Sequence, residues 1–209
     1  SKKVLIILVI AVLFIGGIAL FFFGPNLSSN SPNNANVSGF LSRLFNTQSN
    51  NEESGENLDE QAVDGEVIMQ SSREGWLTYI DPVYVFSFEF PKEFKSSAYE
   101  DDAGDIRVFE DVKTGGGDSS FQIFIMPFDE EGPITADRIK KDLPQAVVEE
   151  PQQAIIGKDK FTVLIFKGAD SVLGETREVW FSHNGYLYQI TAPIGFDGKL
   201  AEIMDMWEF

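Results

Sequence analysis

The chain has 209 residues and a formal net charge of −17. Such an acidic surface repels phosphate groups, which argues against nucleic acid and anionic lipid headgroups as partners. The sequence contains no cysteine, so disulfides, thiol catalysis and cysteine-based zinc sites are excluded. Its 19 phenylalanines, 5 tyrosines and 3 tryptophans indicate that part of the chain builds a substantial core.

An unbroken apolar run begins at Val4 and ends at Phe23. About 20 residues at helical rise span about 30 Å, the thickness of the hydrocarbon core of a bilayer. The run is longer than the apolar part of a cleaved signal peptide, and no small-residue cleavage pattern follows it. Lys2 and Lys3 precede it, so we expect residues 1–3 in the cytoplasm and the remainder outside. The pattern predicts a single-pass protein of a bacterial-type envelope, in contact with membrane lipid through this span.

Residues 24–72 are rich in Asn, Ser, Glu and Gly. Such a composition buries too little apolar area to offset chain entropy, so it predicts a flexible linker. Residues 37–45 interrupt it with apolar side chains at helical spacing. Two interpretations stay open for this island: a short helix that lies on the membrane or on a partner, or a transient helix within the linker.

From residue 73 to residue 209 the pattern is that of a folded domain. Phe86, Phe88 and Phe90 alternate with Ser87 and Glu89, which is typical of a half-buried strand. Further apolar runs and turn signals, among them an Asn-Gly pair, predict strands and hairpins along the rest of the domain. The predicted strands cover residues 84–90, 106–112, 121–128, 155–156, 161–166, 175–182 and 186–191.

Two helices are expected among these strands. Thr135 can cap the first, Ile139 and Leu143 point inward, and Pro144 ends it. The second begins near Asp197 and places four apolar side chains on one stripe, namely Leu200, Ile203, Met204 and Trp207. Antiparallel strands broken by two helices predict an α+β domain, with the helices packed on an antiparallel sheet.

Two segments of this domain resemble a known group of folds. Residues 79–91 read YIDPVYVFSFEFP, and residues 184–191 read NGYLYQIT before the terminal helix. Both resemble PsbP-like and Mog1-like α/β sandwich domains, over about residues 76–209, although Val85 stands where that group often has Gly. PsbP-type proteins support the water-oxidising photosystem and Mog1-type proteins bind a small GTPase. The resemblance implies a binding or assembly module without catalysis, and no partner residue is transferred from it.

No set of residues in the sequence predicts catalysis. His183 is the only histidine and lies in a Ser-His-Asn-Gly turn, where a polar residue is expected in any case. The glycines from Gly115 to Gly117 lack the Lys-Ser/Thr end of a phosphate-binding loop and are typical of a hairpin connection. We therefore expect neither an enzyme nor a cofactor.

Three acidic residues, Asp101, Asp102 and Asp105, are weak candidates for calcium ligands, because carboxylate oxygens suit this ion. Trp180 and Tyr188 are weak candidates for a partner surface, with packing beneath a helix as the alternative. The expected function is a membrane-anchored, extracytoplasmic module that binds an envelope protein through a sheet face or acidic loops. The alternatives are a carboxylate-dependent hydrolase of wall polysaccharide and a calcium-stabilised surface domain.

Overall fold

The computed structural model describes residues 66–209, except residues 102 and 116. Most of this part of the chain lies in antiparallel strands, with few helices between them. The elements in chain order are β1 (Val67–Gln70), β2 (Trp76–Asp81), β3 (Phe86–Pro91), β4 (Phe94–Asp101), β5 (Gly104–Asp111), β6 (Ser120–Pro127), α3 (Ala136–Asp142), β7 (Glu149–Ile156), β8 (Phe161–Asp170), β9 (Gly174–His183), β10 (Tyr186–Pro193), η2 (Ile194–Phe196) and α4 (Asp197–Asp205).

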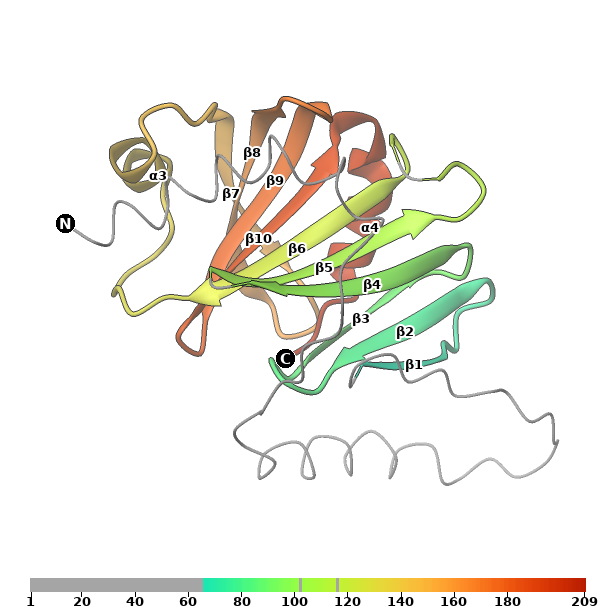
Figure 1. The fold of residues 1–209 in the computed structure, drawn as a ribbon. Coiled ribbons are helices and arrows are strands. Elements are labelled where there is room, and N and C mark those ends of the chain that lie inside the picture. Colours follow the sequence, from blue (N-terminus) through green and yellow to red (C-terminus); the bar gives the residue numbers. More distant parts are fainter. Residues whose placement is uncertain (1–65, 102, 116) are drawn as a thin grey trace, which may run out of the picture.

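The strands form two sheets (Figure 1). The small sheet has the order β1-β2-β3, and the large sheet has the order β4-β5-β6-β10-β9-β8-β7. The small sheet and α4 pack on one face of the large sheet, and α3 packs on the opposite face. The α+β arrangement of mostly antiparallel strands is therefore confirmed for the described residues.

The main core lies between the two sheets and α4 and consists largely of aromatic rings. Phe86, Phe88 and Phe90 are buried on one face of β3, as their alternation predicts. Trp207 stacks on Phe86 with ring centroids 4.6 Å apart, and Phe109 stacks on Phe121 at 4.7 Å. Aromatic pairs in such geometries stabilise a core beyond the area that they bury. The small sheet and α4 therefore cover this face of the large sheet.

Both helices form where the sequence predicts them. The Thr135 side chain accepts a hydrogen bond from the backbone N–H of Arg138 and so caps the start of α3. In and just beyond α4, Leu200, Ile203, Met204 and Trp207 are all buried. The Asn184-Gly185 hairpin between β9 and β10 has φ values of 48° and 81°, as a tight turn with two left-handed residues requires.

Two features of the small sheet differ from the sequence-based expectations. β1 lies inside the segment that composition assigns to the linker, so the folded part begins no later than Glu66 instead of at residue 73. β1 has only four residues, follows a polar segment and is held by pairing with β2. β3 begins at Phe86 instead of Tyr84, because Val85 has a φ of 57° in the preceding turn. Glycine adopts this conformation most readily, so valine carries a conformational cost at this position.

The span from Val4 to Phe23, the linker up to residue 65 and the island at residues 37–45 lie outside the described residues. Within residues 66–209, no helix has the length and apolar character needed to cross a membrane.

Candidate ligand-binding site

A pocket of about 350 Å³ lies on the face of the large sheet that carries α3. Its floor comes from β6, β8, β9 and β10, and α3 with the loop after it forms one wall. The pocket is lined mainly by apolar side chains, among them Phe124, Met126, Ile139, Phe166, Trp180 and Leu187. A concave, mostly apolar pocket with a few polar groups is the usual form of a ligand site.

The pocket exists because the helical cover of this face is short. α3 has seven residues, and Ile139 is its one buried side chain. It packs with Phe124, Leu164 and Phe166 into a second, smaller core. α3 therefore covers only part of this sheet face. The polar side chains Thr176, Glu178 and Thr191 lie beyond α3, on β9 and β10.

Glu178 is a buried carboxylate in the lining of this pocket, with 9% of the residue exposed. Oε1 accepts a hydrogen bond from the Thr176 hydroxyl at 2.7 Å. Oε2 accepts from the Thr191 hydroxyl at 2.8 Å and from Nε1 of Trp180 at 3.1 Å. Burial raises the pKa of Glu178, and these three donors oppose the increase. Among the described residues, its hydrogen-bond partners are all neutral and none of the ion pairs includes it.

Gly168 of β8 allows this carboxylate to lie close to the neighbouring strand. It pairs with Thr176 across the β8–β9 ladder and also lines the pocket. A Cβ atom at this position would lie 2.7 Å from Oγ1 of Thr176 and 3.1 Å from Oε1 of Glu178. Glycine at this position therefore lets the side chains of Thr176 and Glu178 pack directly against the β8 backbone.

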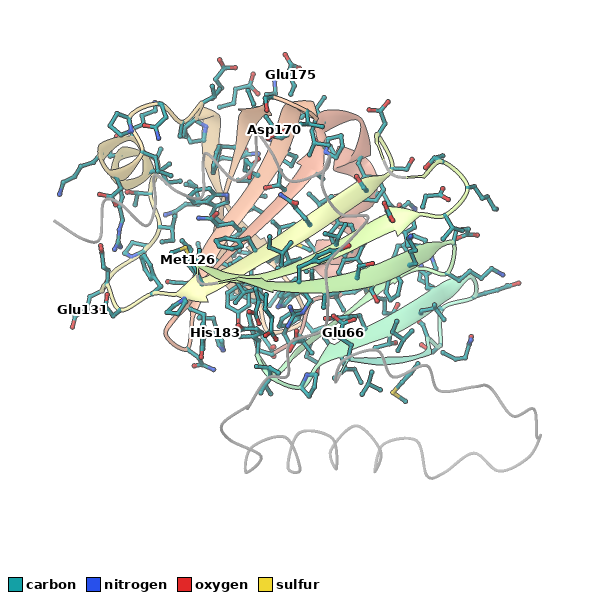
Figure 2. The ribbon with its side chains drawn as sticks, viewed as in Figure 1. Glu66, Met126, Glu131, Asp170, Glu175 and His183 are labelled. Atoms are coloured by element: carbon teal, nitrogen blue, oxygen red, sulfur yellow. The ribbon has the colours of Figure 1, made fainter. Side chains whose placement is uncertain are left out.

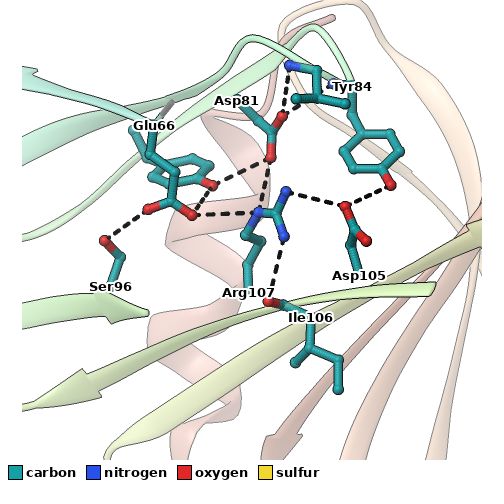
Figure 3. A network of polar contacts seen from close by, with 9 residues as sticks. Glu66, Asp81, Tyr84, Ser96, Asp105, Ile106 and Arg107 are labelled. Atoms are coloured by element: carbon teal, nitrogen blue, oxygen red, sulfur yellow. Dashed lines mark hydrogen bonds and ion pairs between the residues drawn. The ribbon is translucent and has the colours of Figure 1, made fainter. Parts of the chain in front are cut away.

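A second buried charged cluster lies on the other face, between the sheets (Figure 3). Nε of Arg107 is 3.0 Å from Oδ2 of Asp81 and 3.3 Å from Oε1 of Glu66. Its Nη2 is 3.4 Å from Oδ2 of Asp105, which also accepts a hydrogen bond from the Tyr84 hydroxyl at 2.8 Å. This cluster connects the residue before β1 with the end of β2 and with β5.

The electrostatics of this cluster follow from burial. Burial raises the pKa of Glu66, opposed by its hydrogen bonds and by Arg107. Burial lowers the pKa of Arg107, but Asp81 and the other neighbouring acidic groups outweigh burial and raise it overall. Oδ1 of Asp81 also accepts from the backbone N–H groups of Val83 and Tyr84, each at 3.0 Å. The cluster fixes the β2–β3 turn and the start of the domain, which is a structural role.

The calcium candidates lie at the β4–β5 hairpin. Asp105 directs its carboxylate toward Arg107 and Tyr84, and a positive guanidinium at this distance competes with a cation. Asp101 ends β4, and Asp102 lies outside the described residues. Within the described part of the chain, no three acidic or histidine side chains gather in a group that could hold a metal ion. Calcium binding at the hairpin stays a prediction.

The two candidates for a partner surface lie on opposite faces of the large sheet. Trp180 pairs with Gln189 and lines the pocket, whereas Tyr188 pairs with Phe181 and is fully buried in the main core. Tyr188 therefore has no surface to offer, and this part of the expectation is wrong. The alternative of packing fits both residues, since Trp180 contacts the core beneath α3 and Tyr188 lies with Trp207.

His183 ends β9, and its ring packs on the face of the large sheet that carries the main core, opposite the pocket. Figure 2 shows it far from Asp170 and Glu175, which lie near the start of this strand. Its ring stacks on Phe209 with centroids 3.7 Å apart, and burial lowers its pKa. Gly115 and Gly117 lie in the β5–β6 connection with φ values of 70° and 65°.

Neither Glu178 nor Gly168 belongs to a sequence pattern that predicts a site. On β9, Thr176, Glu178 and Trp180 alternate with Arg177 and Val179, so the face of Glu178 reads as polar and exposed. The signal that was available is the glycine inside a β-branched and aromatic strand, which often marks a close approach of neighbouring groups.

No known protein family and no curated protein matches the chain. Among solved structures, the chain is similar to the solution structure of cyanobacterial PsbP (CyanoP) from Synechocystis sp. PCC 6803. The two share 14% identity over 66% of this chain and 94% of that chain, with a TM-score of 0.48. PsbP is one of the two kinds of domain that residues 79–91 and 184–191 resemble, and a likeness at this level says nothing about partner or activity.

Proposed function

We propose that residues 66–209 form a binding module that takes a ligand into the pocket beneath α3. The observation that carries this proposal is a pocket of about 350 Å³ with apolar walls and a buried carboxylate facing it. This volume lies within the range of small-molecule sites. The binding surface is then the sheet face that α3 covers only in part.

The role is binding without catalysis. Both oxygens of Glu178 are held by hydrogen bonds from neutral side chains, which suits a fixed recognition group better than a mobile acid or base. With the apolar span from Val4 to Phe23 as a membrane anchor, the module would work outside the cytoplasm on a component of the envelope. An envelope protein that presents a single side chain to the pocket is one such component, and a small molecule is another.

The test is to identify what the pocket retains. The full chain, purified in phosphatidylcholine nanodiscs, is incubated with a small-molecule extract of the producing cells, washed and analysed by mass spectrometry. Ala146→Phe places a ring in the pocket lining, whereas Val172→Phe adds the same ring at an exposed position of the β8–β9 turn. We expect at least one compound to be retained by the wild type and by Val172→Phe but lost from Ala146→Phe. Identical retention by all three proteins would contradict a ligand site beneath α3.

A further inference from the structure

The charged groups of the pocket are arranged for a positively charged ligand. Of the described charged residues in its lining, Asp142, Asp170 and Glu178 are acidic and Arg138 is basic. Arg138 is already engaged: its guanidinium pairs with the carboxylate of Glu130 and lies 4.8 Å from the centre of the Phe128 ring. The pocket therefore presents a net negative lining at the end of an apolar cavity.

Glu178 has one acceptor position left for a ligand. An ionised carboxylate can accept about four hydrogen bonds, two at each oxygen. Oε2 already accepts two, from Thr191 and Trp180, and Oε1 accepts one, from Thr176. The remaining position lies on Oε1, the oxygen that lies close to Gly168.

A single open position distinguishes between cationic groups. A guanidinium binds a carboxylate best through two parallel hydrogen bonds, one to each oxygen. An ammonium is a compact point charge that needs only one acceptor from each partner. The occupied Oε2 therefore disfavours a guanidinium and leaves an ammonium as the group that fits.

Building on the proposed function, we propose that the pocket binds a primary alkylammonium group, with its apolar chain against Phe166, Trp180 and Leu187 and its charge against Oε1 of Glu178. A ligand of this class would supply the positive charge that the described neighbours of Glu178 do not. Two sources carry this chemistry, a small amphiphilic amine and the lysine side chain of a partner protein.

The test uses the full chain in phosphatidylcholine nanodiscs, labelled with fluorotryptophan and observed by fluorine NMR. The chain has 3 tryptophans, so Trp180 reports on the pocket while Trp76 and Trp207 report on the closed core. Trp180→Phe assigns the signals. Phenethylammonium, phenethyl alcohol and hydrocinnamate are titrated separately, because they share a ring and differ in charge.

We expect phenethylammonium to shift the Trp180 signal saturably, with a dissociation constant at least about tenfold lower than that of the alcohol. Hydrocinnamate should give no saturable shift, and the Trp76 and Trp207 signals should stay in place. Equal binding of ammonium and alcohol would overturn the assignment of an ammonium site and leave the ligand pocket standing. Binding of none of the three at Trp180 would contradict both proposals.

Variants test the role of the carboxylate. Glu178→Gln should reduce phenethylammonium binding about tenfold, to the level of the alcohol, while Glu175→Gln on the same strand should bind as the wild type does. Gly168→Ala keeps the charge but its Cβ would lie 3.1 Å from Oε1 and displace the carboxylate, so it should weaken ammonium binding selectively. Unchanged ammonium binding in Glu178→Gln would overturn the proposal. The titration of the three ligands on the wild type tests the proposed ammonium site even where a variant folds poorly.

Two peptides separate the sources of the ammonium group. One has a single lysine between two leucines, and the other replaces this lysine by norleucine. Tighter binding of the lysine peptide than of phenethylammonium would support a protein partner, and the reverse order would support a small amine. Equal binding of the two peptides would show that the charge is not recognised and would contradict the proposal.

Discussion

The two faces of the large sheet each bury carboxylates, but they compensate the charge differently. Between the sheets, Glu66, Asp81 and Asp105 surround Arg107, whose ion-pair distances are 3.0 to 3.4 Å. On the α3 face, Glu178 is held by two hydroxyls and an indole N–H, all neutral. One cluster carries its own cation, and the other lines an apolar pocket.

This difference separates a structural site from a binding site. A buried carboxylate is costly unless it is paired or fully hydrogen-bonded. The Arg107 cluster meets this condition with residues from distant parts of the domain and so holds the two sheets together. Glu178 meets it only in part, with one acceptor position open toward the pocket, and a ligand can complete it.

The largest effect is expected from removing the internal cation. Arg107→Met leaves three buried or partly buried carboxylates without a counter-charge, which should lower the free energy of unfolding by about 3–5 kcal/mol. Urea denaturation of the full chain, followed by tryptophan fluorescence, measures this loss. Lys95→Met, which removes an exposed partner of Glu110, serves as the control and should change stability little. Equal stability of Arg107→Met and the wild type would show that the cluster does not hold the sheets together.

On the α3 face, the close approach of Thr176 and Glu178 to Gly168 can be tested directly. Gly168→Ala places a Cβ atom 2.7 Å from Oγ1 of Thr176 and 2.9 Å from Cγ of Glu178, so these side chains must shift. Such overpacking should lower the free energy of unfolding by about 1–3 kcal/mol. The same denaturation assay measures it, with Gly198→Ala as the control because nothing lies within 4 Å of its added Cβ. A neutral Gly168→Ala would mean that the Glu178 site adapts easily.

A smaller effect on the free energy of unfolding, of opposite sign, is expected in the β2–β3 turn that follows Asp81. Val85 has a φ of 57°, which costs a β-branched residue about 1–2 kcal/mol, whereas glycine carries an entropic cost of about 0.5–1 kcal/mol. Val85→Gly should therefore raise the free energy of unfolding by about 0.5–1 kcal/mol. Val83→Gly, at an exposed neighbouring position, is the control and should not stabilise. Destabilisation by Val85→Gly would show that the turn is relaxed with valine.

The smallest effect is expected from pH. Burial raises the pKa of Glu66 and of Glu178 above the ordinary value of 4.5, so the folded state binds more protons than the unfolded state in this window. Stability should then rise as the pH falls from neutral toward about 5, since protonation removes a buried charge. Below 4.5 the exposed Glu150 and Glu202, whose pKa values are lowered by their basic partners, lose those ion pairs and the trend reverses.

Melting temperatures of the full chain across this range measure the trend. Glu178→Gln should show a shallower rise than the wild type, and Glu175→Gln should match the wild type. Identical slopes in Glu178→Gln and the wild type would mean that Glu178 does not titrate in this window.

The sequence predicts local features of the fold well, because each depends on neighbouring residues. The alternation around Phe88, the Asn184-Gly185 turn and the Thr135 cap all form as their patterns indicate. β1 is harder to predict, because its apolar run has only three residues beside a polar segment and pairing with β2 holds it in place.

The candidate site depends on strand register and on how α3 covers the sheet, and neither can be predicted from a local sequence pattern. Trp180 pairs with Gln189, and so Trp180 and Tyr188 face opposite sides of the sheet. From the sequence, Glu178 is expected to be an exposed residue on a polar strand face. In the structure, Gly168, Thr191 and the second core beneath α3 surround it. The sequence thus points to Trp180 but not to Glu178, the carboxylate to which the Trp180 indole donates a hydrogen bond.

The most direct test of the account is hydrogen exchange of the full chain in nanodiscs, with and without phenethylammonium chloride. We predict slower exchange in peptides from α3 and from residues 143–148, because a ligand in the pocket fixes this wall against the sheet. Peptides from β3 and α4, which enclose the main core, should exchange at the same rate in both samples. Unchanged exchange at α3, or a uniform change across all peptides, would contradict a ligand site on this face of the sheet.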